Sequence, residues 1–147
     1  SGESIFTETF WRFDAAPGAG DDTAAALLAR WARLRELREA ANKEIEAQRG
    51  AGGVGSSLQA ELAITAPAPD HALLASLGED LKFVFITSRV TLAAGDALAI
   101  AVTPSTAPKC QRCWHWRDDV GHDAAHPQLC GRCTSNLYGA GEARQFA

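Results

Sequence analysis

Hydrophobic residues recur every three or four positions in the first third of the chain. They are Leu27, Trp31, Leu34, Leu37, Ala41 and Ile45. This spacing places apolar side chains on one face of an α-helix. Asp21 or Asp22 is suited to cap the N-terminus of such a helix. Gly50 is suited to end it, because glycine readily takes a left-handed conformation just beyond a helix. The pattern therefore predicts a long helix over residues 22–49.

The following third of the chain has shorter apolar segments. Alternation of apolar with polar or small residues over 58–64 predicts a half-buried strand. Asp70 is expected to cap a short helix over 71–77. Residues 81–87 are rich in β-branched and aromatic side chains, which predicts a buried strand. Two further strands are expected, over 90–92 and 97–103. Together these segments predict a small strand–helix–strand–strand unit.

A glycine-rich segment joins the long helix to the first strand. Gly50, Gly52 and Gly55 satisfy the pattern G-x-G-x-x-G. A dinucleotide site needs a strand before that pattern and a helix after it, so that phosphates meet a helix N-terminus. Here the order is reversed. A flexible connector is therefore the interpretation that we favour.

Composition narrows the function only slightly. The 147 residues carry a formal net charge of -4, which does not favour a general binder of polyanions. No apolar stretch approaches 18 residues, so no membrane span is expected. The N-terminal sequence lacks the pattern of a secretory signal, and we expect a cytoplasmic protein.

Four cysteines form the most specific motif of the chain. Cys110 and Cys113 form one C-x-x-C pair, and Cys130 and Cys133 form a second pair, separated from the first by sixteen residues. Two such turns supply four thiolates in a tetrahedron, which is the arrangement of a structural zinc site. We expect one zinc ion per chain, closed to water and therefore not catalytic.

Other interpretations of the cysteines are less well supported. Two disulfides need an oxidising compartment, and a redox C-x-x-C pair is not normally duplicated. His115, His122 and His126 are alternative ligands, although histidines beside four cysteines are more often surface residues or supports of the ligands.

An aromatic and basic segment lies between the two cysteine pairs. One of Trp114 and Trp116 is expected in the core, and the other, beside Arg117, would offer a stacking platform for an unpaired base. The alternative is that both tryptophans pack the zinc module against its neighbour. No nucleophile elbow, phosphate loop or acid–base pair of carboxylates is recognisable, so the isolated chain is not expected to be an enzyme.

Several segments resemble the C-terminal region of bacterial isoleucyl-tRNA synthetases, and the resemblance covers essentially the whole chain. These segments are Ser4–Phe6, Leu34–Glu46, Val54–Ala60, Lys109–Trp116, Leu129–Cys133 and Gly141–Ala147. The class I signature motifs for ATP, HIGH and KMSKS, are absent. The resemblance therefore implies a non-catalytic fragment of an isoleucine–tRNA ligase, in which only the full-length enzyme binds ATP.

The resemblance also implies an organisation and partners. It divides the chain into the end of a helical anticodon-binding domain (1–50), a small α/β junction domain (51–106) and a zinc-binding domain (107–147). The expected fold class is thus α+β. The expected partners of a monomer are isoleucine tRNA and the rest of the synthetase chain. The residues to which we assign RNA contact are Arg112, Trp114, His115, Trp116, Arg117 and Arg132.

Two alternatives remain at this stage. The formamidopyrimidine-DNA glycosylases have a related zinc module that grips DNA, although their catalytic N-terminal proline and glutamate are absent here. A free-standing zinc module that binds another protein is the second alternative.

Overall fold

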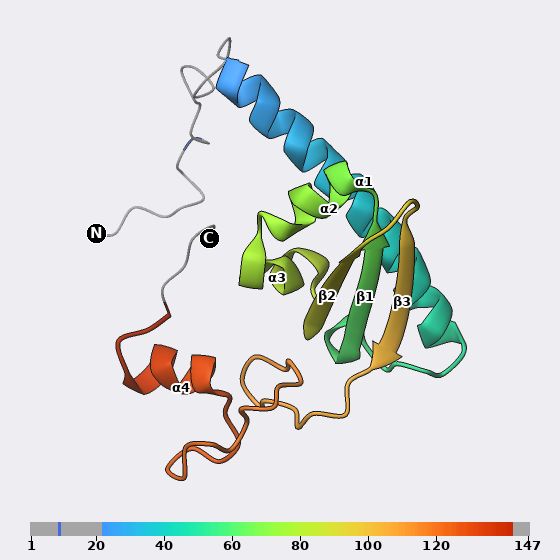
Figure 1. The fold of residues 1–147 in the computed structure, drawn as a ribbon. Helices are drawn as coiled ribbons and strands as arrows, with labels where there is room; N and C mark the ends of the chain where they lie inside the picture. The colour runs from blue at the N-terminus through green and yellow to red at the C-terminus, as the bar shows by residue number, and fades with distance from the viewer. Residues whose placement is uncertain (1–8, 10–21, 143–147) are drawn as a thin grey trace. The chain divides into compact units, whose positions relative to one another are not determined.

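The computed structural model describes Thr9 and residues 22–142 (Figure 1). The chain divides into two compact units, Ser1–Arg33 and Leu34–Ala147. The sheet and the cysteines both belong to the second unit. The expected lead-in over residues 1–20 lies, apart from Thr9, outside the described residues. Among the described residues, no helix is both long enough and apolar enough to cross a membrane.

The first helix, α1, spans Asp22–Gly50 and confirms the prediction of a long helix. The second half of its apolar stripe is buried, at Leu34, Leu37, Ala41 and Ile45. The first half is not, because Leu27 and Trp31 are 51% and 38% exposed. Gly50 is still helical, and it is Gly52, at φ +77°, that takes the left-handed conformation. The prediction that Gly50 does so is wrong by two residues.

The glycine-rich segment is anchored rather than free. Val54 is buried in the hydrophobic core, and the Gly55 N–H donates to Gln59 Oε1 at 2.8 Å. A 3-10 helix, η2 (Ser57–Gln59), and then a strand follow it. The segment thus joins a helix to a strand, and the order needed for a dinucleotide site is absent.

Three strands form a mixed sheet in the order β2-β1-β3. The central strand β1 (Ala60–Ala66) pairs in parallel with β2 (Arg89–Ala94) and antiparallel with β3 (Ala99–Pro104). The register places Leu62 between Val90 and Val102. Since side chains alternate between the faces of a strand, this alignment gathers apolar residues of all three strands on one face.

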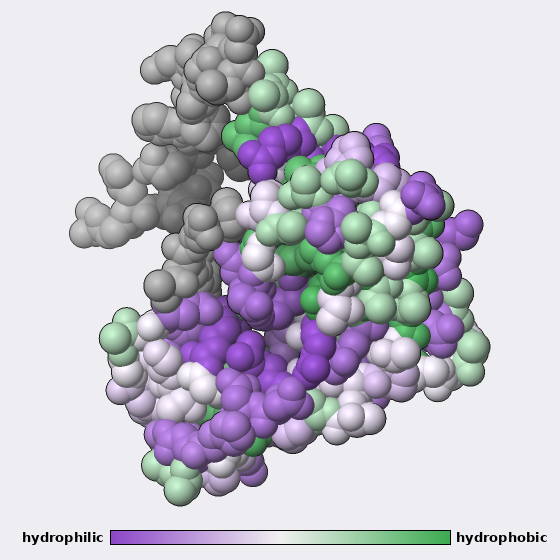
Figure 2. Space-filling view, in the orientation of Figure 1, coloured by the Kyte–Doolittle hydropathy of each residue, from purple (hydrophilic) through white to green (hydrophobic). Residues whose placement is uncertain are grey.

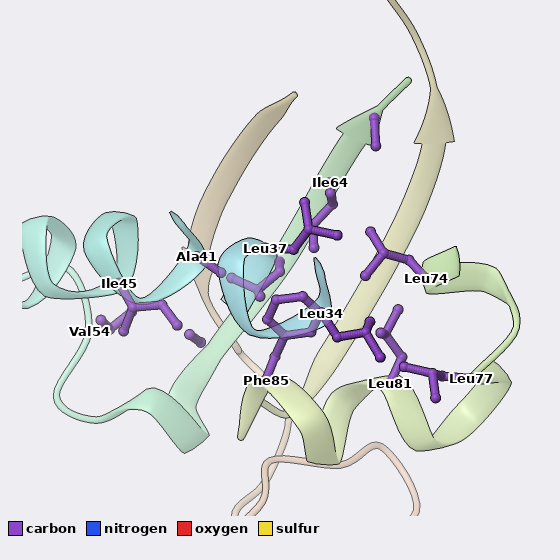
Figure 3. Close-up of a cluster of buried hydrophobic side chains, with 13 residues drawn as sticks. Leu34, Leu37, Ala41, Ile45, Val54, Ile64, Leu74, Leu77, Leu81 and Phe85 are labelled. Carbon is purple, nitrogen blue, oxygen red and sulfur yellow. The ribbon is translucent and has the colours of Figure 1, made fainter. Parts of the chain in front are cut away.

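That face carries the core of the second unit (Figure 3). The alternating residues of β1, among them Leu62 and Ile64, are almost completely buried, as predicted. Leu34 and Leu37 of α1 belong to the same cluster, together with Phe85. The covered face of the sheet therefore depends on α1 and on the segment that connects β1 to β2.

That connection contains α2 (Ala68–Ala75), the 3-10 helix η3 (Gly78–Asp80) and α3 (Leu81–Phe85). The predicted strand over 81–87 is wrong. A short apolar run has no clear period, and here Leu81 and Phe85, four positions apart, are both buried, as helical spacing allows. The cap prediction is also wrong, because Asp70 lies inside the first turn of α2, after the cap residue Pro67.

Candidate metal centre

The four cysteines of the two C-x-x-C pairs converge at one point in the structure. All four sulfur atoms lie within 4.8 Å of one another. The Sγ atoms of Cys113 and Cys130 are 3.8 Å apart. Zn–S bonds of about 2.3 Å in a tetrahedron require sulfur atoms about 3.8 Å apart. The sulfur cluster therefore fits a single tetrahedral zinc ion, as the spacing of the motif predicts.

Each C-x-x-C pair is shaped by backbone hydrogen bonds. In the first, the Trp114 N–H donates to Cys110 O at 3.0 Å, and the Cys110 N–H donates to His115 O at 2.9 Å. In the second, Cys130 immediately precedes helix α4 (Gly131–Tyr138), and the Thr134 N–H donates to Cys130 O. One pair thus lies on a tight hairpin and the other lies on the first turn of a helix.

The buried residues of this region are mainly the cysteines themselves. We call residues 108–142 the zinc module. Its cluster of buried side chains consists of Cys110, Cys130 and Cys133, with partly buried Val120 and Leu129 against it. So little apolar burial cannot hold such a segment without metal, whose binding contributes on the order of 10 kcal/mol in comparable modules. The zinc is therefore structural.

Burial raises the pKa of the cysteine thiols, whereas hydrogen bonds donated to their sulfur atoms lower it. Burial opposes ionisation of Cys110, but backbone N–H groups, including that of Cys130, donate to its sulfur and lower its pKa to about 6. Burial raises the pKa of Cys113 to about 11 and also raises that of Cys130. A metal cation is what allows such buried thiols to ionise together at neutral pH.

The two arginines inside the C-x-x-C turns have different surroundings. Arg112 is exposed, and its Nη1 donates to Cys133 Sγ at 3.7 Å, so it can offset the charge of the thiolates. Arg132 donates to Glu142 Oε2 at 2.6 Å, and its guanidinium lies 4.7 Å from the centre of the Phe83 ring. The glutamate keeps the pKa of Arg132 above its ordinary value.

Arg117 and Asp119 link the two halves of the module. The Arg117 guanidinium donates to both carboxylate oxygens of Asp119, at 2.9 and 3.1 Å. Asp119 Oδ2 also accepts the N–H of Gly131, at the start of α4. A Cβ at Gly131 would lie 3.0 Å from that oxygen, so a side chain at this position would crowd the carboxylate.

The zinc module is held against the sheet by residues from α3 and the start of β2. The backbone N–H of Trp116 donates to Ser88 Oγ at 2.7 Å, and Arg89 pairs with Asp118 at 2.6 Å. Phe83 contacts the ring of His115 edge-on, with centroids 5.6 Å apart. The hydroxyl, the ion pair and the aromatic ring together fix the module next to the first residues of β2.

The two tryptophans have different environments. Trp114 is 58% exposed, and its backbone takes φ +65°, a conformation that is rare for a bulky residue. Trp116 is half-buried. The ammonium group of Lys109 lies 5.7 Å from the ring centre of Trp114 and 5.0 Å from that of Trp116. The expectation of one exposed tryptophan is confirmed, although the other is not fully buried.

The histidines are not among the metal-binding residues of the described part. His115 Nδ1 lies 3.2 Å from Cys113 O, and burial lowers its pKa. The ring of His126 stacks on that of Tyr138, with centroids 3.8 Å apart. These histidines support the module through its backbone and its aromatic contacts.

Comparison with known proteins identifies the module and extends the match to the whole chain. Residues 108–136 match the family described as the zinc finger found in FPG and IleRS. The chain is 54% identical to the isoleucine–tRNA ligase of Bordetella petrii over 145 residues, and 50% identical to that of Ralstonia pickettii over 148 residues. These matches cover 98% and 99% of this chain. The chain is related to one segment of isoleucine–tRNA ligase. It spans about 15% of the length of these relatives.

The relationship to the ligases confirms the resemblance that the motifs carry. The partial coverage of these relatives agrees with the expectation that the chain corresponds to a fragment of such a ligase. The family and the sulfur geometry together support a single structural zinc held by the four cysteines.

The sequence did not reveal the partners of the charged side chains. Phe83 and Ser88 were not predicted to contribute to this region, because their contacts connect segments far apart in the chain. Asp119 is only two residues from Arg117, but the spacing alone does not show that the two side chains meet. Lys109 was not among the residues to which RNA contact was assigned from the sequence. The C-x-x-C turn that separates Lys109 from Trp114 was the available signal for its contact with both indole rings, because such a turn brings the residues on its two sides together.

Proposed function

We propose that this chain is the tRNA-contacting C-terminal part of an isoleucine–tRNA ligase, in which the zinc module presents Trp114 to the RNA. The observation that carries this proposal is the exposed indole of Trp114 with the ammonium group of Lys109 near its ring. An exposed aromatic ring next to a cation is suited to stack on an unpaired base while the cation meets a phosphate.

Ion pairing narrows the set of basic residues available to RNA. Arg117 is paired with Asp119, and Arg132 is paired with Glu142. Lys109 and Arg112 have no carboxylate within ion-pair distance among residues 22–142. We therefore place the primary contact at Lys109, Arg112 and Trp114. In this proposal Trp116 and His115 pack beneath the contact, and the ion pairs of Arg117 and Arg132 stabilise the fold of the module.

One visible face of the segment after β3 favours a polar partner. On the face shown in Figure 2, the segment that follows β3 is largely hydrophilic. A zinc module that bound another protein would be expected to show an apolar centre. Two cations make few phosphate contacts, and the net charge of the chain is -4. The interaction should therefore be weak and sensitive to salt, with most of the affinity for tRNA lying elsewhere in the ligase.

A DNA-binding function is the second candidate, because the matched zinc-finger family also occurs in FPG. The match of almost the whole chain to isoleucine–tRNA ligases favours RNA over DNA. Unpaired bases of tRNA can stack on an exposed indole, whereas the bases of a DNA duplex are already stacked on one another.

Titration of the zinc-loaded chain with three nucleic acids tests the proposal. The ligands are isoleucine tRNA, a non-cognate tRNA and a DNA duplex, each at low and at physiological salt. We expect preference for tRNA over the duplex, and about one counterion fewer in the salt dependence for Lys109→Gln. Asp96→Asn, which changes one exposed charge outside residues 1–50 and outside the zinc module, is the control and should leave the salt dependence as in the wild type. Equal binding of tRNA and duplex by every variant would contradict the proposal.

The rest of the ligase is the second proposed partner. Leu27, Leu28 and Trp31 form an exposed apolar face on the first half of α1. Because the chain spans about 15% of its relatives, we propose that this face packs against the remainder of the ligase. Trp31→Asp should then weaken association with that remainder in a pull-down, whereas Lys43→Asp should not. Unchanged association of Trp31→Asp would contradict this assignment.

The remaining proposals follow from the same role. We propose the division into an anticodon-binding end (1–50), a junction domain (51–106) and a zinc-binding domain (107–147). ATP would bind only to the rest of the ligase, which would attach isoleucine to the tRNA. The location would be the cytoplasm, where tRNA is charged for translation.

A further inference from the structure

The four cysteines differ in their access to solvent. Cys110, Cys130 and Cys133 have no exposed surface, whereas Cys113 is only partly buried. Cys113 is followed by Trp114, which has a left-handed backbone and a largely exposed indole. One ligand of an otherwise closed site is therefore reachable from solvent.

The hydrogen bonds around the sulfurs reinforce this difference. Arg112 donates to Cys133 Sγ, and the backbone N–H of Cys130 donates to Cys110 Sγ. Hydrogen-bond donors reduce the nucleophilicity of a thiolate, and burial excludes the reagent. Cys113 and Cys130 are 3.8 Å apart at their sulfurs, which is close enough for a disulfide after a small movement of the side chains.

We propose that Cys113 is the oxidant-sensitive ligand of the zinc site, and that a peroxide converts Cys113 and Cys130 to a disulfide. The Cys113 thiolate attacks one peroxide oxygen, forms an S–O bond and releases hydroxide. The Cys130 thiolate then attacks the Cys113 sulfur, forms the S–S bond and releases a second hydroxide. Two thiolates lose two electrons in total, and the peroxide gains them. The two remaining thiolates cannot retain the metal, so zinc leaves. This inference does not depend on the RNA-binding proposal.

The sequence allows a direct test of which cysteine reacts. Trypsin cleaves after Lys109, Arg112, Arg117 and Arg132. Each cysteine therefore falls in a different peptide. The zinc-loaded chain is treated with limiting hydrogen peroxide, released zinc is followed with a chromogenic chelator, and the remaining thiols are blocked before digestion. We expect zinc release to accompany loss of free thiol from peptide 113–117, and a disulfide-linked pair of peptides 113–117 and 118–132.

Two matched variants distinguish the effect of the exposure of Cys113 to peroxide from the effect of replacing any one cysteine ligand. Cys113→His and Cys133→His each leave three cysteines and one imidazole, a set that also binds zinc. Cys113→His should release zinc about fivefold more slowly than the wild type under peroxide, whereas Cys133→His should not be slower. Zinc content before treatment shows that both variants are loaded. First oxidation at any other cysteine, or equal protection by the two variants, would overturn the proposal.

Discussion

The Arg117 guanidinium donates two hydrogen bonds to the Asp119 carboxylate, and the same carboxylate accepts the N–H of Gly131 at the start of α4. The hairpin that carries Cys110 and Cys113 is thereby joined to the helix that carries Cys133. The ion pair thus fixes the distance between the two halves of the ligand set. Its role in the module is structural.

Replacing Asp119 with asparagine should destabilise the zinc-loaded module. The amide keeps the shape but loses the charge that holds Arg117. Because both side chains are partly exposed, we expect a loss of about 1 kcal/mol in the free energy of unfolding. Chemical denaturation measures it. Asp96→Asn, on an exposed turn, is the control and should be within error of the wild type. Equal stability of all three proteins would contradict the structural role.

This loss of stability should not vary with pH near neutrality. The hydrogen bond from Arg117 holds the pKa of Asp119 below its ordinary value of 3.8. The stabilisation is therefore present at every pH above the unfolded-state pKa, and is lost only as the pH falls through the folded-state pKa. Melting curves from about pH 8 to about pH 6 should show a constant gap between wild type and Asp119→Asn. A gap that shrinks across this range would mean that another group is responsible.

Ile86 offers a separate test of backbone strain. It ends α3 at φ +55°, where a β-branched residue is unfavourable, and its side chain is largely exposed. Asparagine tolerates this conformation, so Ile86→Asn should raise stability by about 1 kcal/mol. Leu98→Asn, at an exposed position without positive φ, controls for the change in polarity. An equal effect of the two substitutions on thermal stability would show that Ile86 is not strained.

Removal of zinc should unfold the module selectively. The cluster of buried side chains in the module centres on the ligands, whereas the sheet and α1 share a separate hydrophobic core. Hydrogen exchange after treatment with a chelator should show loss of protection in residues 108–138 and retention of protection in β1. Loss of protection in both regions at the same rate would show that the two cores unfold together.

The metal site was predictable from the sequence because four cysteines at fixed spacing leave few geometric solutions. The long helix was predictable because its apolar period persists over many turns. The segment 81–87 was not, since five to seven apolar residues fit a buried strand as well as a short helix. Phe85 is buried in the same cluster as Leu34 of α1, and no local pattern contains that long-range association.

The sequence did not show which cations of the zinc module are paired with carboxylates. The sequence showed Arg112, Arg117 and Arg132 as similar cations on one motif. Only the fold shows that Arg117 forms an ion pair with Asp119 and that Arg132 forms one with Glu142. Such partners depend on side-chain positions that sequence spacing does not determine.

The most direct test of the RNA contact is the affinity of Trp114→Gly for isoleucine tRNA. Glycine accepts the left-handed backbone at this position, so the variant should bind zinc and fold at least as well as the wild type. The side chain that we propose for stacking is absent. We predict binding about tenfold weaker than that of the zinc-loaded wild type, at equal zinc content and equal salt. Unchanged affinity in a fully zinc-loaded Trp114→Gly variant would contradict the account.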